Sequence, residues 1–172
     1  LCGTMSVGKT TLVNALKELE QFKGYKFATE RSQHLMSLGI PLNTDSTLKG
    51  QTVFLAERCG ELMHDNIITD RTILDVMAFT LNAKSIPHQD KDAFETYASE
   101  FIREYDYIFY ISPHGLKIED NGVRETDEHY RDLIDFTITT LIKRHGHKAG
   151  KIEKISGSTE ERIQQILNIT SL

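Results

Sequence analysis

Cysteine is scarce in this chain, with only Cys2 and Cys59 among 172 residues. Neither belongs to a Cys-x-x-Cys pair or to a cluster of cysteines and histidines, as the ligands of a structural zinc ion do. Small disulfide-stapled domains carry many more cysteines for their length. The sequence therefore argues against a disulfide scaffold and a structural zinc site, and both cysteines are predicted to be small buried apolar residues in a reducing compartment.

The chain also lacks a long hydrophobic run. The longest, Tyr107 to Ile111, has the length of a strand, whereas a helix that spans a membrane needs about 20 apolar residues. There is no secretory signal either. These absences predict a cytoplasmic protein without a membrane partner.

Basic charge is not in excess, because 20 lysines and arginines face 25 aspartates and glutamates, and the formal net charge is −5. The basic residues are scattered and form no block. A general nucleic-acid surface usually has the opposite sign, since neutralising phosphates supplies most of its affinity. A nucleic-acid partner is therefore disfavoured, although a local basic groove stays open.

What the chain does contain is the composition of one packed domain, with 39% hydrophobic and 26% charged residues. A length of 172 residues suits a single domain with a proper core and is short for two. We therefore expect one domain over residues 1–172. Only Leu1 and Cys2 precede the first motif, so we expect the first strand to be truncated at the N-terminus.

Short apolar runs alternate with longer stretches of helical period, and this pattern predicts an α/β fold with a parallel sheet. The strands are expected at residues 1–2, 25–29, 66–69, 107–112 and 151–156. The helices are expected at residues 9–20, 32–38, 52–64, 73–82, 91–104, 127–144 and 159–168. The last helix begins with Ser158-Thr159-Glu160-Glu161, which is a capping box.

The most specific motif is at residues 3–10, which read Gly-Thr-Met-Ser-Val-Gly-Lys-Thr, the complete pattern Gly-x-x-x-x-Gly-Lys-Ser/Thr of a phosphate-binding loop. Its glycines let the backbone wrap with N–H groups inward, and the following helix adds its positive N-terminal end. Lys9 is expected to reach the β- and γ-phosphates, and Thr10 to offer its hydroxyl to Mg²⁺. The predicted ATP-binding residues are Gly3, Thr4, Met5, Ser6, Val7, Gly8, Lys9, Thr10 and Thr11.

A second site follows the apolar strand at residues 66–69, which ends in Asp70-Arg71. Ligands of doubly wound sheets bind at the carboxyl ends of the strands, so both side chains should emerge beside the phosphate loop. Asp70 can hold a magnesium-bound water or position the acceptor hydroxyl, and Arg71 can neutralise the transferring phosphate. The alternative is that Asp70 caps the next helix and Arg71 pairs with Asp75.

The preceding strand ends in the same way, in Thr29-Glu30-Arg31. A carboxylate at this edge can accept the proton of an attacking hydroxyl, because phosphoryl transfer asks the protein mainly for positioning and charge stabilisation. Glu30 and Asp70 are therefore rival candidates for the catalytic base. A charge pair at a helix N-terminus is the plainer interpretation of Glu30.

Residues 113–127 are polar, include two glycines, and separate the fourth strand from the longest helix. A loop of this size is often functional, so we expect a lid over about residues 113–131. If the helix begins near Glu125, Arg124 and Arg131 can both face the sheet and close over the phosphates as an internal arginine finger. The alternatives are a plain connection and solvated helix charges.

Together these motifs resemble the P-loop nucleoside and nucleotide kinase superfamily, in particular the small AAA-type ATPase/kinase family that includes ribosylnicotinamide kinase domains and many phage-encoded kinases. The matching segments run in order through most of the chain and are residues 3–10, 29–31, 68–71, 74–75, 105–107, 120–124, 130–131 and 157–162. The resemblance implies a three-layer fold with a five-stranded parallel sheet ordered 2-3-1-4-5 and helices on both faces. It also implies that ATP and Mg²⁺ bind at the phosphate loop.

The resemblance further implies an acceptor pocket between the ends of the second and third strands and the helical region 46–64. Related deoxynucleoside kinases have a catalytic acid after the second strand and an Asp-Arg or Glu-Arg pair after the third. Glu30 and Asp70-Arg71 resemble these groups. The chain departs from those kinases in lacking their signatures for recognising the acceptor base.

The sequence therefore predicts an ATP- and Mg²⁺-dependent kinase that moves the γ-phosphoryl group to a nucleoside-like or nucleotide-like small molecule. The predicted catalytic residues are Lys9, Glu30, Asp70, Arg71, Arg124 and Arg131. Mg²⁺ is expected at Thr10 and Asp70.

Three other functions are weighed against this one. A kinase that acts on a nucleic-acid hydroxyl, at a modified base or a strand end, is the first alternative, which the acidic charge disfavours. An acceptor-independent NTPase is less favoured, because the chain has no Asn/Thr-Lys-x-Asp guanine motif. An oligomeric motor ATPase would carry paired acids where Asp70 is followed by arginine. The acceptor, and whether the protein forms a homodimer, stay open.

Overall fold

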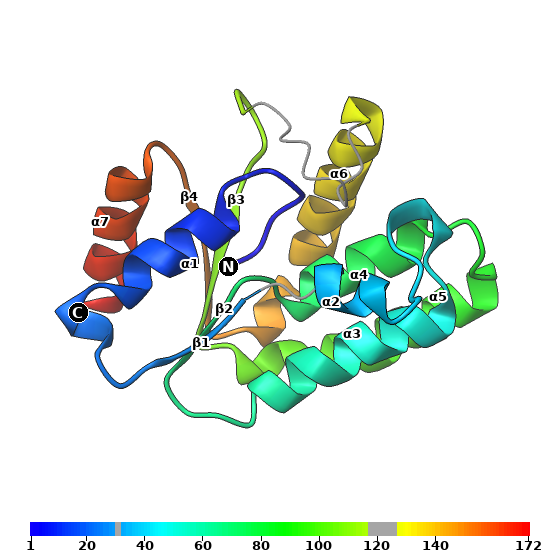
Figure 1. Ribbon diagram of the computed structural model, residues 1–172, viewed down its shortest axis with the longest axis horizontal. Coiled ribbons are helices and arrows are strands. Elements are labelled where there is room, and N and C mark those ends of the chain that lie inside the picture. Colours follow the sequence, from blue (N-terminus) through cyan, green and yellow to red (C-terminus); the bar gives the residue numbers. More distant parts are fainter. Residues whose placement is uncertain (30–31, 117–126) are drawn as a thin grey trace.

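The computed structural model describes residues 1–29, 32–116 and 127–172, in which helices and strands alternate as predicted for an α/β fold (Figure 1). The strands are β1 (Lys26–Ala28), β2 (Ile67–Thr69), β3 (Tyr107–Ile111) and β4 (Lys151–Ile155). The α-helices are α1 (Lys9–Lys17), α2 (Ser32–Ser37), α3 (Leu48–Glu61), α4 (Ile73–Asn82), α5 (His88–Ala98), α6 (Glu128–His145) and α7 (Thr159–Thr170). Within these described ranges, no helix has both the length and the apolar character that a membrane span requires.

The strands form two parallel pairs, β1 with β2 and β3 with β4. The predicted first strand is instead a single bridge, in which Cys2 N donates to Phe109 O and Ile111 N donates to Cys2 O, both at 2.9 Å. On the other side, the backbone nitrogen of Leu1 donates to Thr69 O at 2.7 Å. Residues 1–2 therefore lie between the two pairs, and the order of a continuous five-stranded sheet stays a prediction.

Helices cover both faces of these strands, because successive side chains of a strand point to opposite faces. In β3, Ile108 and Tyr110 pack in a core with α4, α5 and α6, whereas Phe109 and Ile111 pack in a second core with α1 and α7. Figure 1 shows the same arrangement, with α1 and α7 on one side of the strands and α3, α4 and α6 on the other.

The strand β2 is less buried than its apolar sequence predicts, since Ile67 and Ile68 are only half-buried. Both line a cavity of about 440 Å³, together with Leu16, Tyr107 and other residues. The cavity extends along β2 and the first half of β3, and none of residues 3–8 lines it.

Two helix starts differ from the prediction, and for one of them the capping residue supplies the reason. The helix α3 begins at Leu48 and not at residue 52, since the Thr47 hydroxyl accepts a hydrogen bond from Gly50 N at 3.1 Å. The predicted helix at residues 91–104 is α5, which begins at His88, followed by the 3₁₀-helix η3 (Ser99–Glu104).

The start of α6 bears directly on the predicted arginine finger. This helix begins at Glu128 and not near Glu125, because the carboxylate of Asp127 accepts a hydrogen bond from His129 N at 2.9 Å. The helix therefore starts later than the arginine-finger prediction assumed. Arg124 lies outside the described residues, so its relation to Arg131 stays a prediction.

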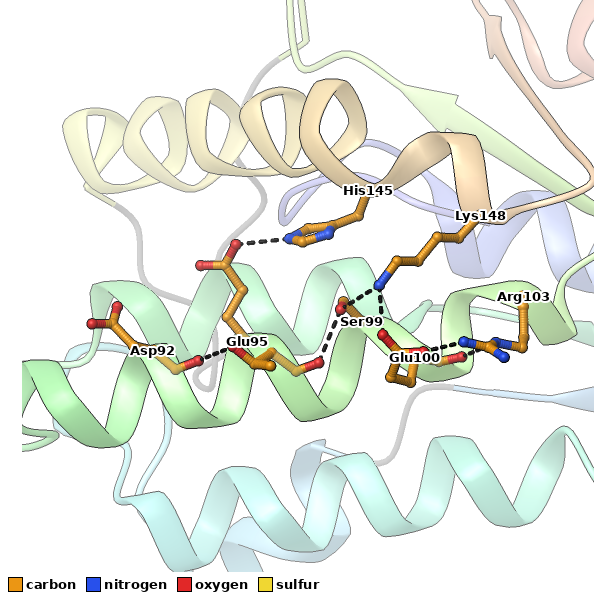
Figure 2. Close-up of polar contacts among 8 residues, drawn as sticks. Asp92, Glu95, Ser99, Glu100, Arg103, His145 and Lys148 are labelled. Carbon is orange, nitrogen blue, oxygen red and sulfur yellow. Dashed lines mark hydrogen bonds and ion pairs between the residues drawn. The ribbon is translucent and has the colours of Figure 1, made fainter.

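A polar cluster joins α5 and η3 to the end of α6 and the 3₁₀-helix η4 (Gly146–Lys148), as Figure 2 shows. The carboxylate of Glu95 accepts from Arg144 Nη1 at 2.5 Å and lies 2.8 Å from His145 Nε2. Lys148 Nζ donates to Ser99 Oγ and to the Glu100 carboxylate, both at 2.8 Å. We name this set the α5–α6 clamp: Glu95, Ser99, Glu100, Arg144, His145 and Lys148.

Candidate active site

The loop at residues 3–8 has a backbone that few side chains would allow. A β-carbon at Gly3, where φ is 151°, would lie 2.5 Å from the carbonyl oxygen of Ile111. Ser6 and Gly8 have φ of 58° and 80°, in the left-handed region that glycine adopts without strain. Gly8 is also the N-cap of α1 and offers no capping side chain, so the first N–H groups of this helix stay available to a ligand.

Lys9 lies across this loop with a buried side chain. Its Nζ donates to Gly3 O at 2.6 Å and to Thr4 O at 2.7 Å. Burial lowers the pKa of Lys9, and the nearby Arg71 guanidinium lowers it further, while two carboxylates act in the opposite direction. The ammonium group is therefore held inside the loop, where a bound anion would favour its charged form.

The hydroxyl of Thr10 donates to Oδ2 of Asp70, which joins the first turn of α1 to the end of β2. The Asp70 side chain is only 1% exposed. Its other oxygen, Oδ1, is buried and accepts no hydrogen bond from any described residue. A buried carboxylate oxygen without a donor is costly, so this position is suited to a cation or to a water that a cation holds.

The Thr10 hydroxyl and the Asp70 carboxylate fit a magnesium site in which the substrate supplies some of the ligands. The described residues contain no group of three or more His, Cys, Asp or Glu side chains that could hold a metal by themselves. Mg²⁺ usually takes only one or two protein groups, with water and phosphate oxygens as its other ligands. Thr10 and Asp70 are therefore sufficient as the protein's share of such a site.

Asp75 connects the phosphate loop to α4, a role that the sequence analysis missed. Its Oδ2 accepts from the backbone nitrogen and the hydroxyl of Thr72, both at 2.8 Å, and its Oδ1 accepts from Gly3 N at 3.1 Å. The N-cap of α4 is thus Thr72, so the alternative in which Asp70 caps this helix is wrong. The spacing Thr-x-x-Asp is the signal that could have revealed the cap.

Arg71 lies on the other side of the site, beside α4. Its guanidinium carbon is 5.0 Å from the ring centre of Phe79, within the range of a cation–π interaction. Arg71 also lines a cavity of about 30 Å³, together with Gln51, Phe54 and residues around Ser46. This cavity lies where the resemblance implied an acceptor pocket, and no sequence motif pointed to Gln51 or Phe54.

Arg131 lies beside the phosphate loop, in the first turn of α6. Its backbone oxygen accepts from the Thr4 hydroxyl at 3.2 Å, and its Nη1 donates to Leu116 O at 2.7 Å. Through its backbone oxygen and its side chain together, Arg131 therefore links the loop to Leu116 in the predicted lid. The other predicted residues, Glu30 and Arg124, lie outside the described residues, as does much of the lid.

A further arginine, Arg162 in α7, reaches the loop from the opposite side. Its Nη1 donates to Val7 O at 2.7 Å. The sequence analysis noted Arg162 only within the capping segment of the last helix. Nothing in that segment indicates a contact with the phosphate loop, because the two residues are 155 positions apart.

Comparison with known proteins gives a family match and similar solved structures. A family model described as "AAA domain" matches residues 1–162. Two structures of deoxyadenosine kinase from M. mycoides are similar, each 19% identical to this chain. The one with the products dCMP and a flexible dCDP has a TM-score of 0.67, over 98% of this chain and 95% of that chain.

The second structure, with bound dCTP, has a TM-score of 0.66, over 99% of this chain and 97% of that chain. A search of curated proteins found no match. At 19% identity these likenesses establish a shared α/β fold, and the chemistry has to be argued from the site.

Proposed function

Because this chain belongs to the AAA domain family, we propose that it is an ATP- and Mg²⁺-dependent phosphotransferase of the P-loop nucleoside and nucleotide kinase superfamily, a proposal that its structural likeness to deoxyadenosine kinase supports. It moves the γ-phosphoryl group of ATP to a nucleoside-like or nucleotide-like small molecule. The enzyme works as one domain over residues 1–172, with a lid over about residues 113–131.

The observation that carries this proposal is the contact between the Thr10 hydroxyl and the Asp70 carboxylate. It unites a phosphate-loop threonine with an acid at the end of a neighbouring strand, and it leaves Asp70 Oδ1 without a described donor. A kinase needs such a pair beside the triphosphate, because its catalysis consists mostly of positioning and charge stabilisation.

In the proposed mechanism the loop backbone and the first turn of α1 bind the triphosphate, and Lys9 exchanges its carbonyl contacts for phosphate oxygens. Thr10 and Asp70 would hold Mg²⁺, which would supply positive charge that neutralises the phosphates. Arg71 and Arg131 stabilise the charge that develops during transfer. Arg124 is a further candidate from the lid, on sequence grounds alone.

The base that activates the acceptor hydroxyl is assigned to Glu30. The bond from Thr10 to Asp70 supports a metal role for Asp70, and that role competes with taking a proton. Glu30 then remains as the carboxylate at the end of the neighbouring strand. Its assignment depends on its position after β1 in the sequence.

Three observations favour small-molecule acceptors. The net charge of −5 disfavours a nucleic-acid surface, and Gln51 and Phe54 lie beside Arg71, around a cavity of about 30 Å³ that has to widen before an acceptor enters. An amide and an aromatic ring are suited to a planar heterocycle, through hydrogen bonds and stacking. The similar deoxyadenosine kinase structures, with their bound deoxynucleotides, also support a nucleoside-like acceptor.

The test is the release of ADP from ATP and Mg²⁺, first without an acceptor and then with nucleosides, nucleoside monophosphates, nicotinamide riboside and hydroxymethylated DNA. We expect strong stimulation by a small-molecule acceptor and its loss in Lys9→Ala. Stimulation by DNA alone would move the acceptor to a nucleic acid. Hydrolysis that no acceptor changes would overturn the kinase proposal in favour of a simple NTPase.

A further inference from the structure

Arg162 is a buried arginine with no acidic partner among the residues that the structure describes. Its side chain is only 7% exposed and lies in the second turn of α7. Its Nε is buried and has no hydrogen-bond acceptor among the described residues. Burial lowers the pKa of Arg162, and no neighbouring charge contributes to this shift. A buried cation without a counter-ion destabilises the fold, so its position calls for another explanation.

Among the described residues, this guanidinium donates a hydrogen bond to the phosphate loop, from Nη1 to Val7 O at 2.7 Å. Val7 O belongs to the peptide group that also carries Gly8 N–H. In a planar trans peptide the C=O and N–H bonds point in opposite directions. Holding Val7 O toward α7 therefore turns Gly8 N–H toward the opposite side of the loop.

Arg162 also approaches Gly8 so closely that a side chain there would crowd it. A β-carbon at Gly8 would lie 3.2 Å from Arg162 Nη1, and Gly8 has a φ of 80°. The glycine thus allows both the left-handed turn and the close approach of the guanidinium. Successive N–H groups that converge in this way form the concave anion site of a phosphate loop.

We infer that Arg162 is a positioning residue for the nucleotide, an inference that depends on the proposed function of the phosphate loop. Arg162 holds the Val7–Gly8 peptide so that Gly8 N–H faces the phosphates. Its positive charge also adds to the field that attracts them. The helix α7, which contributes none of the predicted catalytic groups, thereby controls the affinity for ATP.

The test compares Arg162→Gln and Arg162→Lys with Arg103→Gln, a matched control at an exposed arginine whose partner is Glu100. The dissociation constants of ATP and of adenosine are measured by calorimetry, beside the thermal unfolding midpoint. We expect Arg162→Gln to raise the Kd for ATP about tenfold, the usual effect of losing a hydrogen bond from a charged group. The Kd for adenosine should change little, since adenosine has no phosphate.

Arg162→Lys should recover part of the ATP affinity, because the ammonium restores the charge but not the planar fork. In steady-state kinetics, Arg162→Gln should raise KM for ATP while kcat changes little. The inference is overturned if both variants lower the unfolding midpoint but bind ATP as the wild type does. The same holds if ATP and adenosine affinities fall together, because a packing defect of α7 would then explain both.

These outcomes separate the inference from the proposed function. A wild type that binds ATP but transfers phosphate to no acceptor fails the kinase proposal, and the Arg162 variants still test the positioning role by binding alone. A wild type with kinase activity whose Kd for ATP does not depend on Arg162 fails only the inference.

Discussion

The α5–α6 clamp and the edge of the phosphate loop, where Asp70 and Arg162 lie, both contain buried or partly buried charged side chains. The two regions differ in whether these side chains have partners. In the clamp, each described charge meets an opposite charge or a hydroxyl, as between Arg144 and Glu95 or between Lys148 and Glu100, which Figure 2 shows. At the loop edge, Asp70 Oδ1 and Arg162 Nε are buried and have no described partner. Satisfied groups stabilise a fold, whereas buried groups without partners identify where a ligand is expected.

The largest expected effect is that of Asp70→Asn on activity, which tests whether the loop edge serves function and not stability. Asp70→Asn keeps an acceptor for the Thr10 hydroxyl but removes the charge that Mg²⁺ requires. We expect kcat to fall on the order of 100-fold to 1000-fold, as when a transition-state contact is lost. The free energy of unfolding should hold or increase, because a buried charge is removed. Initial rates over a range of Mg²⁺ concentrations, together with urea unfolding, check both parts.

If Asp70→Asn instead unfolds the protein while its remaining folded fraction stays active, Asp70 belongs with the structural charges of the clamp. That result would remove the contrast between the two regions.

The next effect concerns the backbone of the loop. Gly3→Ala places a β-carbon 2.5 Å from Ile111 O, so we expect a loss of about 1–3 kcal/mol of unfolding free energy from overpacking. ATP affinity should fall as well. The matched control is Gly60→Ala in α3, where nothing lies within 4 Å of the new β-carbon.

Gly60→Ala should raise stability by roughly 0.5–1 kcal/mol through helix propensity. Denaturant unfolding of both variants is the measurement. A Gly3→Ala protein as stable as Gly60→Ala, with ATP affinity intact, would contradict the close packing of the loop against β3.

The smallest effect tests the clamp and has a pH signature. Burial raises the pKa of Glu95, but hydrogen bonds from His145 and Arg144 outweigh it and hold the pKa below its ordinary value of 4.5. An acid with a lowered folded pKa stabilises the protein above its unfolded pKa, and this contribution is lost as the pH falls through the folded value. Glu95→Gln should therefore cost about 1–2 kcal/mol at neutral pH.

The difference in unfolding free energy between wild type and Glu95→Gln should shrink once the pH drops below 4.5, while kcat at neutral pH stays unchanged. Urea titrations across this range supply the measurement. A difference that does not vary with pH, or a large change in kcat, would show that the clamp is not the purely structural region described above.

The helix α4 shows how much of the fold could be predicted. Its predicted range, residues 73–82, is confirmed, because its apolar residues and the cap at Thr72 lie close together in the sequence. The bounds of α3 and α5 were predicted less well, since they depend on the cap at Thr47 and on the 3₁₀ turn that follows α5. The bounds of α6 differ by one residue at each end from the predicted range 127–144. The order of the five strands stays a prediction, because it depends on pairings between distant segments.

The site residues show the same difference between local patterns, which could be predicted, and contacts between distant segments, which could not. The phosphate loop was recognised from eight consecutive residues, and Asp70 from the strand that ends beside it. Gln51, Asp75 and Arg162 were missed as site residues, since no local pattern connects them to the loop. The catalytic roles of Lys9, Asp70, Arg71 and Arg131 stay predictions, as do those of Glu30 and Arg124, which lie outside the described residues.

The sequence by itself determined the phosphate loop and the alternation of strands and helices, because these depend on glycine conformations and side-chain periods among near neighbours. Only the tertiary structure decided which buried polar groups find partners. Asp75 reaches Gly3 across 72 positions and Arg162 reaches Val7 across 155. Such pairings form only when α4 and α7 pack on opposite faces of the strands, and no local sequence rule specifies that packing.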